Sequence, residues 1–165
     1  MKTREEIFSF IEKQTVAFIA SVDKDGFPNM KAMLVPRKID ESSFYFTTNT
    51  SSMRVRQYTN NDKACIYFYS MDSLKYEGVM LIGKMEILTD KETKELIWRS
   101  GDTMFYSKGV EDPDYCVLKF TAKKGRHYCN LVTESFELWE LNSDLFFYLF
   151  FIFYHNLDLH HSEYY

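Results

Sequence analysis

The sequence contains few cysteines, prolines and glycines: three, three and six among 165 residues. Cys65, Cys116 and Cys129 are odd in number and lack CxxC or Cys/His spacing, which argues against a disulfide scaffold and a zinc site. All three fall in strand-like runs, where a thiol usually serves as a small buried hydrophobic group. We therefore expect reduced thiols and a cytoplasmic protein. No Pro/Gly-rich linker and no internal repeat divides the chain.

Long runs of one charge sign and long apolar runs are also missing. The formal charge is −4 and no basic cluster occurs, which argues against a nucleic-acid partner, while 45% apolar residues argue against disorder. Charges interrupt residues 1–14 and no small-residue cleavage site follows, which excludes a secretory signal. The apolar run 145–154 has half of the roughly 20 residues that a spanning helix needs, so we expect no membrane span.

Familiar catalytic and phosphate-binding motifs are absent. The sequence contains no GxSxG, HExxH, GxGxxG or GxxxxGK[ST]. His127 is the one histidine before the aromatic C-terminal tail, and we interpret it as a hydrogen-bonded surface residue of a strand. No side chain is therefore assigned a catalytic role, and a nucleotide-type ligand would have to be bound in another way.

The hydrophobic pattern predicts short helices among many strands. A capping box at Thr3 and Glu6 begins the first helix, and Gly83 marks a bend in a long strand. In a third helix, Leu96 and Ile97 are expected to face inward and the charges to face water. The predicted helices are 4–13, 51–58 and 90–100, and the predicted strands are 16–22, 30–35, 43–48, 64–69, 78–88, 116–121, 126–130 and 136–138. The fold class is mainly β (α+β), an antiparallel barrel with helices at its rim.

One strand–turn–helix junction combines hydroxyl groups with an arginine. A strand ends at Thr47 and Thr48, and the following helix begins with Ser51 and Ser52 and carries Arg54 in its first turn. Hydroxyls, free helix N–H groups and a guanidinium together suit a phosphate monoester. Alternatively, a serine only caps the helix and the arginine is solvated.

Two further cations bear on this junction. Lys31 could reach the same phosphate from the neighbouring hairpin if its strand pairs beside the strand 43–48; otherwise it is a solvated edge charge. Arg56 follows Arg54 by two residues, about 200° around a helix, and is expected to point away from it.

The order of these features resembles the flavin-binding split-barrel family of pyridoxamine 5'-phosphate oxidase, in particular its short general-stress-protein branch. The similar segments are DKDGFPNMKAM, FYFTTNTSSMRVRQY, NNDKACIYFY, YEGVMLIGKMEILTD and LIWRSGDTMFYSKGVEDPDYCVLKF, within residues 3–138. In that family, a Gly-x-Pro hairpin leads into an Arg or Lys, and a Phe-x-Thr strand leads into Ser-x-Lys or Ser-x-Arg. Together these residues bind the phosphate of FMN.

The resemblance implies an antiparallel split β-barrel with peripheral helices, and a homodimer with FMN at the interface. Gly26 and Pro28 match the hairpin motif, Lys31 replaces the frequent arginine, and Met33 is a neighbour of the flavin ring. The candidate cofactor-binding residues are Lys31, Ala32, Met33, Leu34, Phe46, Thr47, Thr48, Ser51, Ser52 and Arg54.

The expected function is that of an FMN-binding oxidoreductase that passes hydride or electrons between NAD(P)H and an unidentified acceptor. The chain lacks the Trp and Arg-x-Arg segment of true pyridoxamine phosphate oxidases, so that reaction is not expected. The alternatives are a non-enzymatic flavin- or haem-binding stress protein on the same barrel, and a dimeric interaction module with an empty cleft.

Aromatic residues are concentrated in a tail that matches nothing in this family. Residues 141–165 contain nine aromatic residues and no Lys or Arg, so we divide the chain into an FMN-binding split-barrel domain, 1–140, and a tail of unknown status. We expect deletion of the tail to leave the flavin affinity and the dimer intact and to improve solubility. If residues 145–154 instead cover the dimer cleft, the same deletion destabilises the fold.

Overall fold

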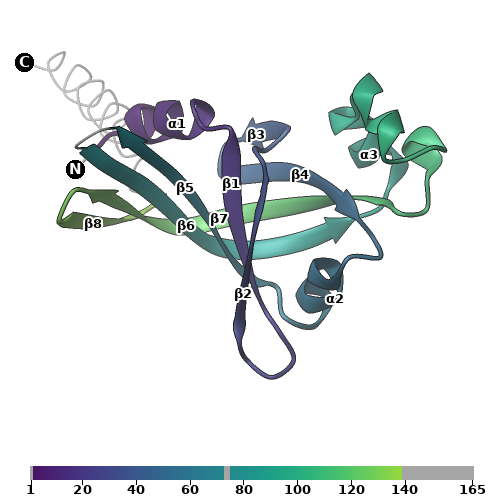
Figure 1. The fold of residues 1–165 in the computed structure, drawn as a ribbon, viewed down its shortest axis with the longest axis horizontal. Helices are drawn as coiled ribbons and strands as arrows, with labels where there is room; N and C mark the ends of the chain where they lie inside the picture. Colours follow the sequence, from purple (N-terminus) through teal and green to yellow (C-terminus); the bar gives the residue numbers. More distant parts are fainter. Residues whose placement is uncertain (1, 73–74, 139–165) are drawn as a thin grey trace, which may run out of the picture.

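The computed structural model describes residues 2–72 and 75–138, which form one curved sheet with helices at its margins (Figure 1). The helices are α1 (Arg4–Glu12), α2 (Met53–Asn60) and α3 (Lys91–Ile97), with 3-10 turns η1 (Ser100–Met104) and η2 (Gly109–Glu111). The strands are β1 (Val16–Val22), β2 (Pro28–Leu34), β3 (Lys38–Asp40), β4 (Ser43–Asn49), β5 (Lys63–Asp72), β6 (Lys75–Leu88), β7 (Tyr115–Cys129) and β8 (Val132–Glu137). The predicted tail and its run 145–154 lie outside the described residues.

The eight strands form a mostly antiparallel sheet that does not close into a complete barrel. The strand order is β2-β1-β5-β6-β7-β4-β3, and β8 pairs with the far half of β7. This arrangement confirms the predicted split-barrel class. The condition stated for Lys31, that its strand pairs beside the strand 43–48, is not met. The strand that carries Lys31, β2, pairs with β1 and not with β4.

Gly83 marks the bend in β6, as the sequence predicted. The register between β6 and β7 shifts between Ile82 and Gly83, so that Lys123 has no partner on β6. A Cβ atom on Gly83 would lie 2.0 Å from the carbonyl oxygen of Thr121. Only glycine lets the two backbones approach this closely at the bulge.

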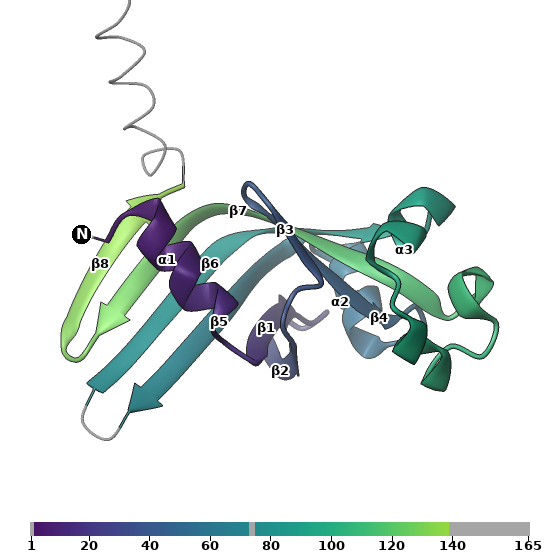
Figure 2. The ribbon, with the colours of Figure 1, turned by 90° about the horizontal axis from the view of Figure 1, so that it is seen from above.

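The main core lies between the concave face of the sheet and α1, which crosses the strands (Figure 2). Thr3 caps α1 in the predicted capping box, and Ile7 and Ile11 point into the core. They pack among buried aromatic residues of the sheet, including Phe44 and Phe68. Burial of these side chains is the dominant stabilising term of the fold.

Several predicted elements required correction. The strand β3 was missed, and the two predicted strands 116–121 and 126–130 form the continuous strand β7. On α3, Ile97 is buried as expected, but Leu96 is 56% exposed and Lys94 is buried. The Lys94 ammonium donates to the Asp112 carbonyl at 3.2 Å and lies 5.3 Å from the Tyr115 ring centroid, which explains why this charge is buried.

Within the described ranges, no helix is long and apolar enough to cross a membrane.

Candidate functional site

Three hollows lie around α2 and the β1–β2 hairpin. The first, which we call the β2–β4 hollow, has a volume of about 320 Å³. It is lined by Lys31, Ala32, Met33, Leu34, Val35, Arg37, Phe46, Thr47, Thr48, Asn49, Arg54, Phe105 and Tyr106. Eight of the ten predicted cofactor-binding residues therefore lie around one cavity.

The second hollow adjoins the first at Lys31 and Arg54, which line both. We call it the Arg54 hollow, and its volume is about 230 Å³. It is lined by Ile19, Ser21, Asn29, Met30, Lys31, Ser52, Met53, Arg54 and Gln57. The tertiary structure thus brings Lys31 and Arg54 to the same two cavities, although they are 23 positions apart in the sequence.

Arg54 is buried without a carboxylate partner in the part of the chain that the structure describes. Its residue exposure is 9%, and its guanidinium donates to the thioether sulfur of Met33, a weak acceptor. Burial lowers the pKa of the Arg54 guanidinium from its ordinary value, but an arginine remains charged at neutral pH. A buried charge normally requires a counter-charge, so this cation favours an anion in the hollow.

The two serines have different surroundings. Ser52 caps α2 by accepting from the Val55 N–H at 3.4 Å, and it also lines the Arg54 hollow. Ser51 lines none of the three hollows, and its N–H donates to the Asp114 carboxylate at 2.7 Å. Asp114 also accepts from the Asn49 side chain at 2.8 Å, and these bonds lower its pKa. Ser51 therefore helps to hold the β4–α2 junction and contributes no side chain to the cavities.

The edge of β2 supplies backbone groups to the β2–β4 hollow. β2 pairs on one side with β1 and has no other strand partner within the described residues. Backbone N–H and C=O groups on its free edge, between Lys31 and Leu34, remain available to a planar polar ligand.

Sequence reasoning missed the wall formed by the η1 segment. Phe105 and Tyr106 line the β2–β4 hollow, with Phe105 75% exposed. Asp102 anchors this segment through an ion pair with Arg37 at 2.5 Å and accepts from the Arg99 N–H at 3.0 Å. Two adjacent aromatic residues in a polar loop are only a weak sequence signal for a cavity wall. Their position beside β2 depends on the ion pair between Arg37 and Asp102, which are far apart in the sequence.

His127 lies outside the three hollows. It is on a strand and hydrogen-bonded, as predicted, but it is buried instead of lying at the surface. Its Nε2 atom lies 3.1 Å from Glu77 Oε1, and Glu77 also pairs with Lys2. These contacts tie the N-terminus to β6 and β7 and assign a structural role to His127.

Comparisons with known proteins match most of the chain to one family model. The family model described as "Pyridoxamine 5'-phosphate oxidase" matches residues 3–129. A pyridoxine/pyridoxamine 5'-phosphate oxidase of Rhizobium leguminosarum is 38% identical over 74 residues, which are 45% of this chain and 34% of that protein. The match therefore spans about a third of the length of such curated relatives.

Solved structures are similar to this chain over most of its length. A Clostridium acetobutylicum protein related to general stress protein 26 has a TM-score of 0.73 and 36% identity, covering 83% of this chain and 95% of that one. General stress protein 26 of Bacillus anthracis has a TM-score of 0.65 at 19% identity, covering 81% and 96%. A haem-binding protein of Mycobacterium smegmatis has a TM-score of 0.68 at 14% identity, covering 84% and 59%, which shows a common fold alone.

Proposed function

Because the chain belongs to the pyridoxamine 5'-phosphate oxidase family, we propose that it is a flavoprotein that binds FMN in the Arg54 and β2–β4 hollows. The observation that carries this proposal is the buried guanidinium of Arg54 with no carboxylate partner among residues 2–72 and 75–138. A phosphate monoester would supply the missing negative charge.

The residues of the two hollows fit the parts of FMN. Lys31 and Arg54 would hold the phosphate from opposite elements, β2 and α2, because both line the Arg54 hollow. The free edge of β2 from Lys31 to Leu34 would hydrogen-bond the polar rim of the ring, and Phe46 and Tyr106 would pack against its apolar part. No acidic residue and no histidine is among the residues that line the β2–β4 hollow.

We propose that the bound group makes the chain an oxidoreductase. When bound, FMN supplies hydride or electron transfer between a donor such as NAD(P)H and an acceptor that is still unidentified. The protein residues would bind and orient the ring, and Lys31 and Arg54, which line the β2–β4 hollow without a carboxylate partner among the described residues, would provide a positive electrostatic environment. The absence of carboxylates and histidines among these lining residues agrees with a reaction carried by the cofactor.

A second copy of the chain would complete the cavity. Large apolar side chains are exposed beside it, including Met30 at 66%, Leu34 at 70% and Phe105 at 75%. Grouped exposed apolar residues typically mark an interaction surface. We therefore propose a homodimer in which the partner covers these side chains and the flavin.

The test is the visible spectrum and thermal stability of the purified chain. With FMN, we expect flavin absorbance at about one FMN per chain and a higher melting temperature, because a ligand of the native state stabilises it. A colourless protein whose melting temperature is unchanged in excess FMN would refute the proposal. Oxidation of NAD(P)H by the loaded protein then distinguishes an enzyme from a non-enzymatic flavin-binding stress protein.

A further inference from the structure

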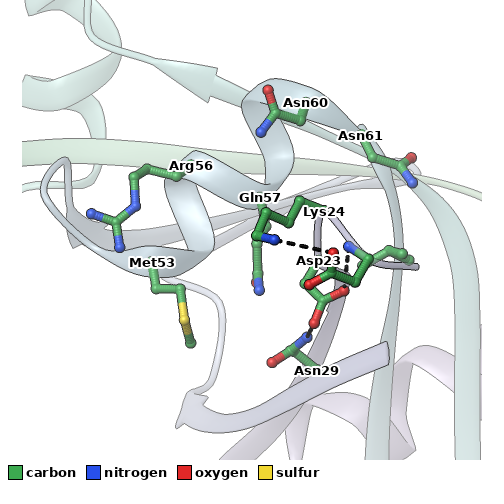
Figure 3. A pocket seen from close by; sticks show the side chains of 10 residues that line it. Asp23, Lys24, Asn29, Met53, Arg56, Gln57, Asn60 and Asn61 are labelled. Atoms are coloured by element: carbon green, nitrogen blue, oxygen red, sulfur yellow. Dashed lines mark hydrogen bonds and ion pairs between the residues drawn. The ribbon is translucent and has the colours of Figure 1, made fainter. Parts of the chain in front are cut away.

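A third hollow continues the cavity beyond the Arg54 hollow (Figure 3). Its volume is about 470 Å³, and we call it the hairpin hollow. It is lined by Val22, Asp23, Lys24, Asp25, Asn29, Met53, Arg56, Gln57, Asn60 and Asn61. Asn29, Met53 and Gln57 also line the Arg54 hollow, so the three cavities follow one another along α2.

Positive and negative charges are balanced in the hairpin hollow. Its two cations, Lys24 and Arg56, are matched in number by the carboxylates of Asp23 and Asp25, and Lys24 pairs with Asp25 at 3.0 Å. The lining residues of the other two hollows include no carboxylate. Arg54 therefore lies in the part of the cavity where positive charge is not balanced, and the acceptors that it contacts determine how strongly it attracts an anion.

The acceptor that the described residues offer to the Arg54 guanidinium is the thioether sulfur of Met33. Met33 is partly buried against the main core and also lines the β2–β4 hollow, so a small molecule in that hollow can reach its side chain. A thioether is a weak acceptor and leaves the guanidinium free to bind a ligand. Oxidation of the same sulfur to a sulfoxide adds a polar oxygen atom beside the guanidinium.

Met53 has different surroundings, although it also lies at the cavities. It is 59% exposed, and no donor contacts its sulfur within the described ranges. Figure 3 shows its side chain extending from α2 away from the Arg56 guanidinium. The contact between a thioether and a guanidinium is therefore a property of Met33 and not of every methionine around α2.

We propose that Met33 is a redox-sensitive modification site, where hydrogen peroxide converts the thioether to a sulfoxide and thereby weakens anion binding by Arg54. The sulfur donates an electron pair to one peroxide oxygen, so that an S–O bond forms and the O–O bond breaks. The departing oxygen takes the proton of the transferred oxygen and leaves as water. The sulfur is oxidised and the peroxide is reduced.

The sulfoxide oxygen would accept a hydrogen bond from the Arg54 guanidinium, and a phosphate would have to compete with it. Because a sulfoxide carries no net charge, it does not neutralise Arg54, and the expected effect is a partial loss of affinity. This inference rests on the proposed function, because it takes the anion to be the FMN phosphate. Bound FMN should cover Met33 and slow its oxidation, since both occupy the β2–β4 hollow.

The test treats the full chain with hydrogen peroxide and follows peptide masses and flavin fluorescence titrations. We expect Met33 to gain about 16 Da, the mass of one oxygen atom, and methionine sulfoxide reductase to reverse the change. The FMN dissociation constant should rise roughly tenfold, the loss of one charge-assisted hydrogen bond, and that of phosphate-free riboflavin should change much less.

Substitutions of methionine separate Met33 from the other methionines. After Met33→Leu, peroxide should no longer change the FMN dissociation constant. Met104→Leu is the matched control and should keep the effect, because Met104 is 85% exposed and lines none of the three hollows. Met33→Gln places a permanent carboxamide acceptor beside Arg54 and should weaken FMN without peroxide.

Each outcome has a distinct meaning. An unmodified Met33, or a Met33 sulfoxide with an unchanged FMN dissociation constant, would overturn this inference and leave the proposed function standing. Equal losses of FMN and riboflavin would also overturn it, because oxidation would then disrupt the cavity without acting through Arg54. If the untreated chain does not bind FMN, the proposed function fails.

The contact itself is tested without flavin by the melting temperatures of the ligand-free Met33→Gln and Met33→Leu chains. Met33→Gln should melt at the higher temperature, because its carboxamide oxygen accepts from the buried guanidinium, whereas leucine offers no acceptor. A higher melting temperature for Met33→Leu would show that an acceptor at this position does not serve Arg54 and would refute the inference.

Discussion

The guanidinium of Arg54 on α2 lies in contact with the thioether of Met33 on β2, across the junction of two cavities. A thioether compensates little of the cost of burying a charge. The pair therefore joins two elements of the proposed flavin site while leaving one cation without a counter-charge within the described part of the chain. We expect this unpaired buried charge to lower the stability of the ligand-free protein and to raise its affinity for an anion.

The unpaired charge of Arg54 gives the first prediction. Arg54→Met should raise the melting temperature of the ligand-free protein, because it removes a buried charge and keeps a similar side-chain length. The same change should weaken FMN by roughly 1.5–3 kcal/mol, the value of a hydrogen bond to a charged group, and affect phosphate-free riboflavin much less. Fluorescence titration and thermal denaturation measure both effects.

Arg56→Ala is the control for FMN, because Arg56 lines neither cavity proposed for FMN. Equal losses of FMN and riboflavin on Arg54→Met would show that Arg54 maintains structure and does not bind phosphate.

The second prediction concerns the ion pair between Arg37 and Asp102, whose side chains are 14% and 5% exposed. Asp102→Asn should lower the free energy of unfolding by about 2–4 kcal/mol, because it leaves a largely buried guanidinium without its counter-charge. FMN should also bind more weakly, since Asp102 fixes the segment that carries Phe105 to the β2–β4 hollow. Urea unfolding and flavin titration test the two effects.

The exposed pair of Lys38 and Asp40, 3.2 Å apart, provides a comparison. Asp40→Asn should cost at most about 1 kcal/mol, because solvent screens exposed pairs. If the two aspartate substitutions had similar effects on unfolding, the anchoring role of Asp102 would be wrong.

The third prediction concerns the bulge in β6. Gly83→Ala would place a methyl group 2.0 Å from the Thr121 carbonyl oxygen, and two paired strands cannot separate there without losing hydrogen bonds. We expect a loss of roughly 2–4 kcal/mol in the free energy of unfolding. Gly101→Ala, where nothing lies within 4 Å of the added atom, should change stability far less. Chemical denaturation of the two variants decides the point.

The fourth prediction concerns the pH dependence of the β4–α2 junction. Hydrogen bonds from Asn49 and from the Ser51 N–H lower the pKa of Asp114. A lowered folded pKa contributes stability that is present above the unfolded value and is lost as the pH falls through the folded value. Asp114→Asn should therefore reduce stability at pH 7, and the difference from the parent chain should shrink below about pH 3.8, the unfolded value for an aspartate.

Urea unfolding at several pH values measures this difference. Glu12→Gln is the control, because Glu12 is an exposed carboxylate without a partner in the described residues. A difference between the Asp114→Asn and parent chains that stayed constant from pH 7 to pH 3 would contradict the assignment of this carboxylate.

Local sequence patterns determined the identity of most elements. The capping box at Thr3, the hairpin turn at Gly26 and the Ser52 cap are each formed by residues close in sequence, so their partners are visible in the chain itself. The separation of Arg54 from Arg56 follows from helical geometry alone, and the structure confirms that they line different cavities.

Other features depended on neighbours far away in the chain. The two runs that form β7 were predicted as separate strands because two lysines lie between them, and pairing with β6 on both sides of the bulge makes them one strand. Lys94 is polar by sequence, but its ammonium lies over the Tyr115 ring and donates to the Asp112 carbonyl, so Lys94 is buried while Leu96 is exposed.

The candidate site shows the same division. The sequence by itself determined that hydroxyl and guanidinium groups are adjacent at the start of α2, which is the basis of the proposed phosphate site. The strand order decided that Lys31 joins Arg54, that Phe105 forms a wall and that the cavity continues along α2. Side-chain periodicity reports which face of an element is buried, whereas the contacts between elements depend on which strands pair, and that is fixed only when the whole sheet forms.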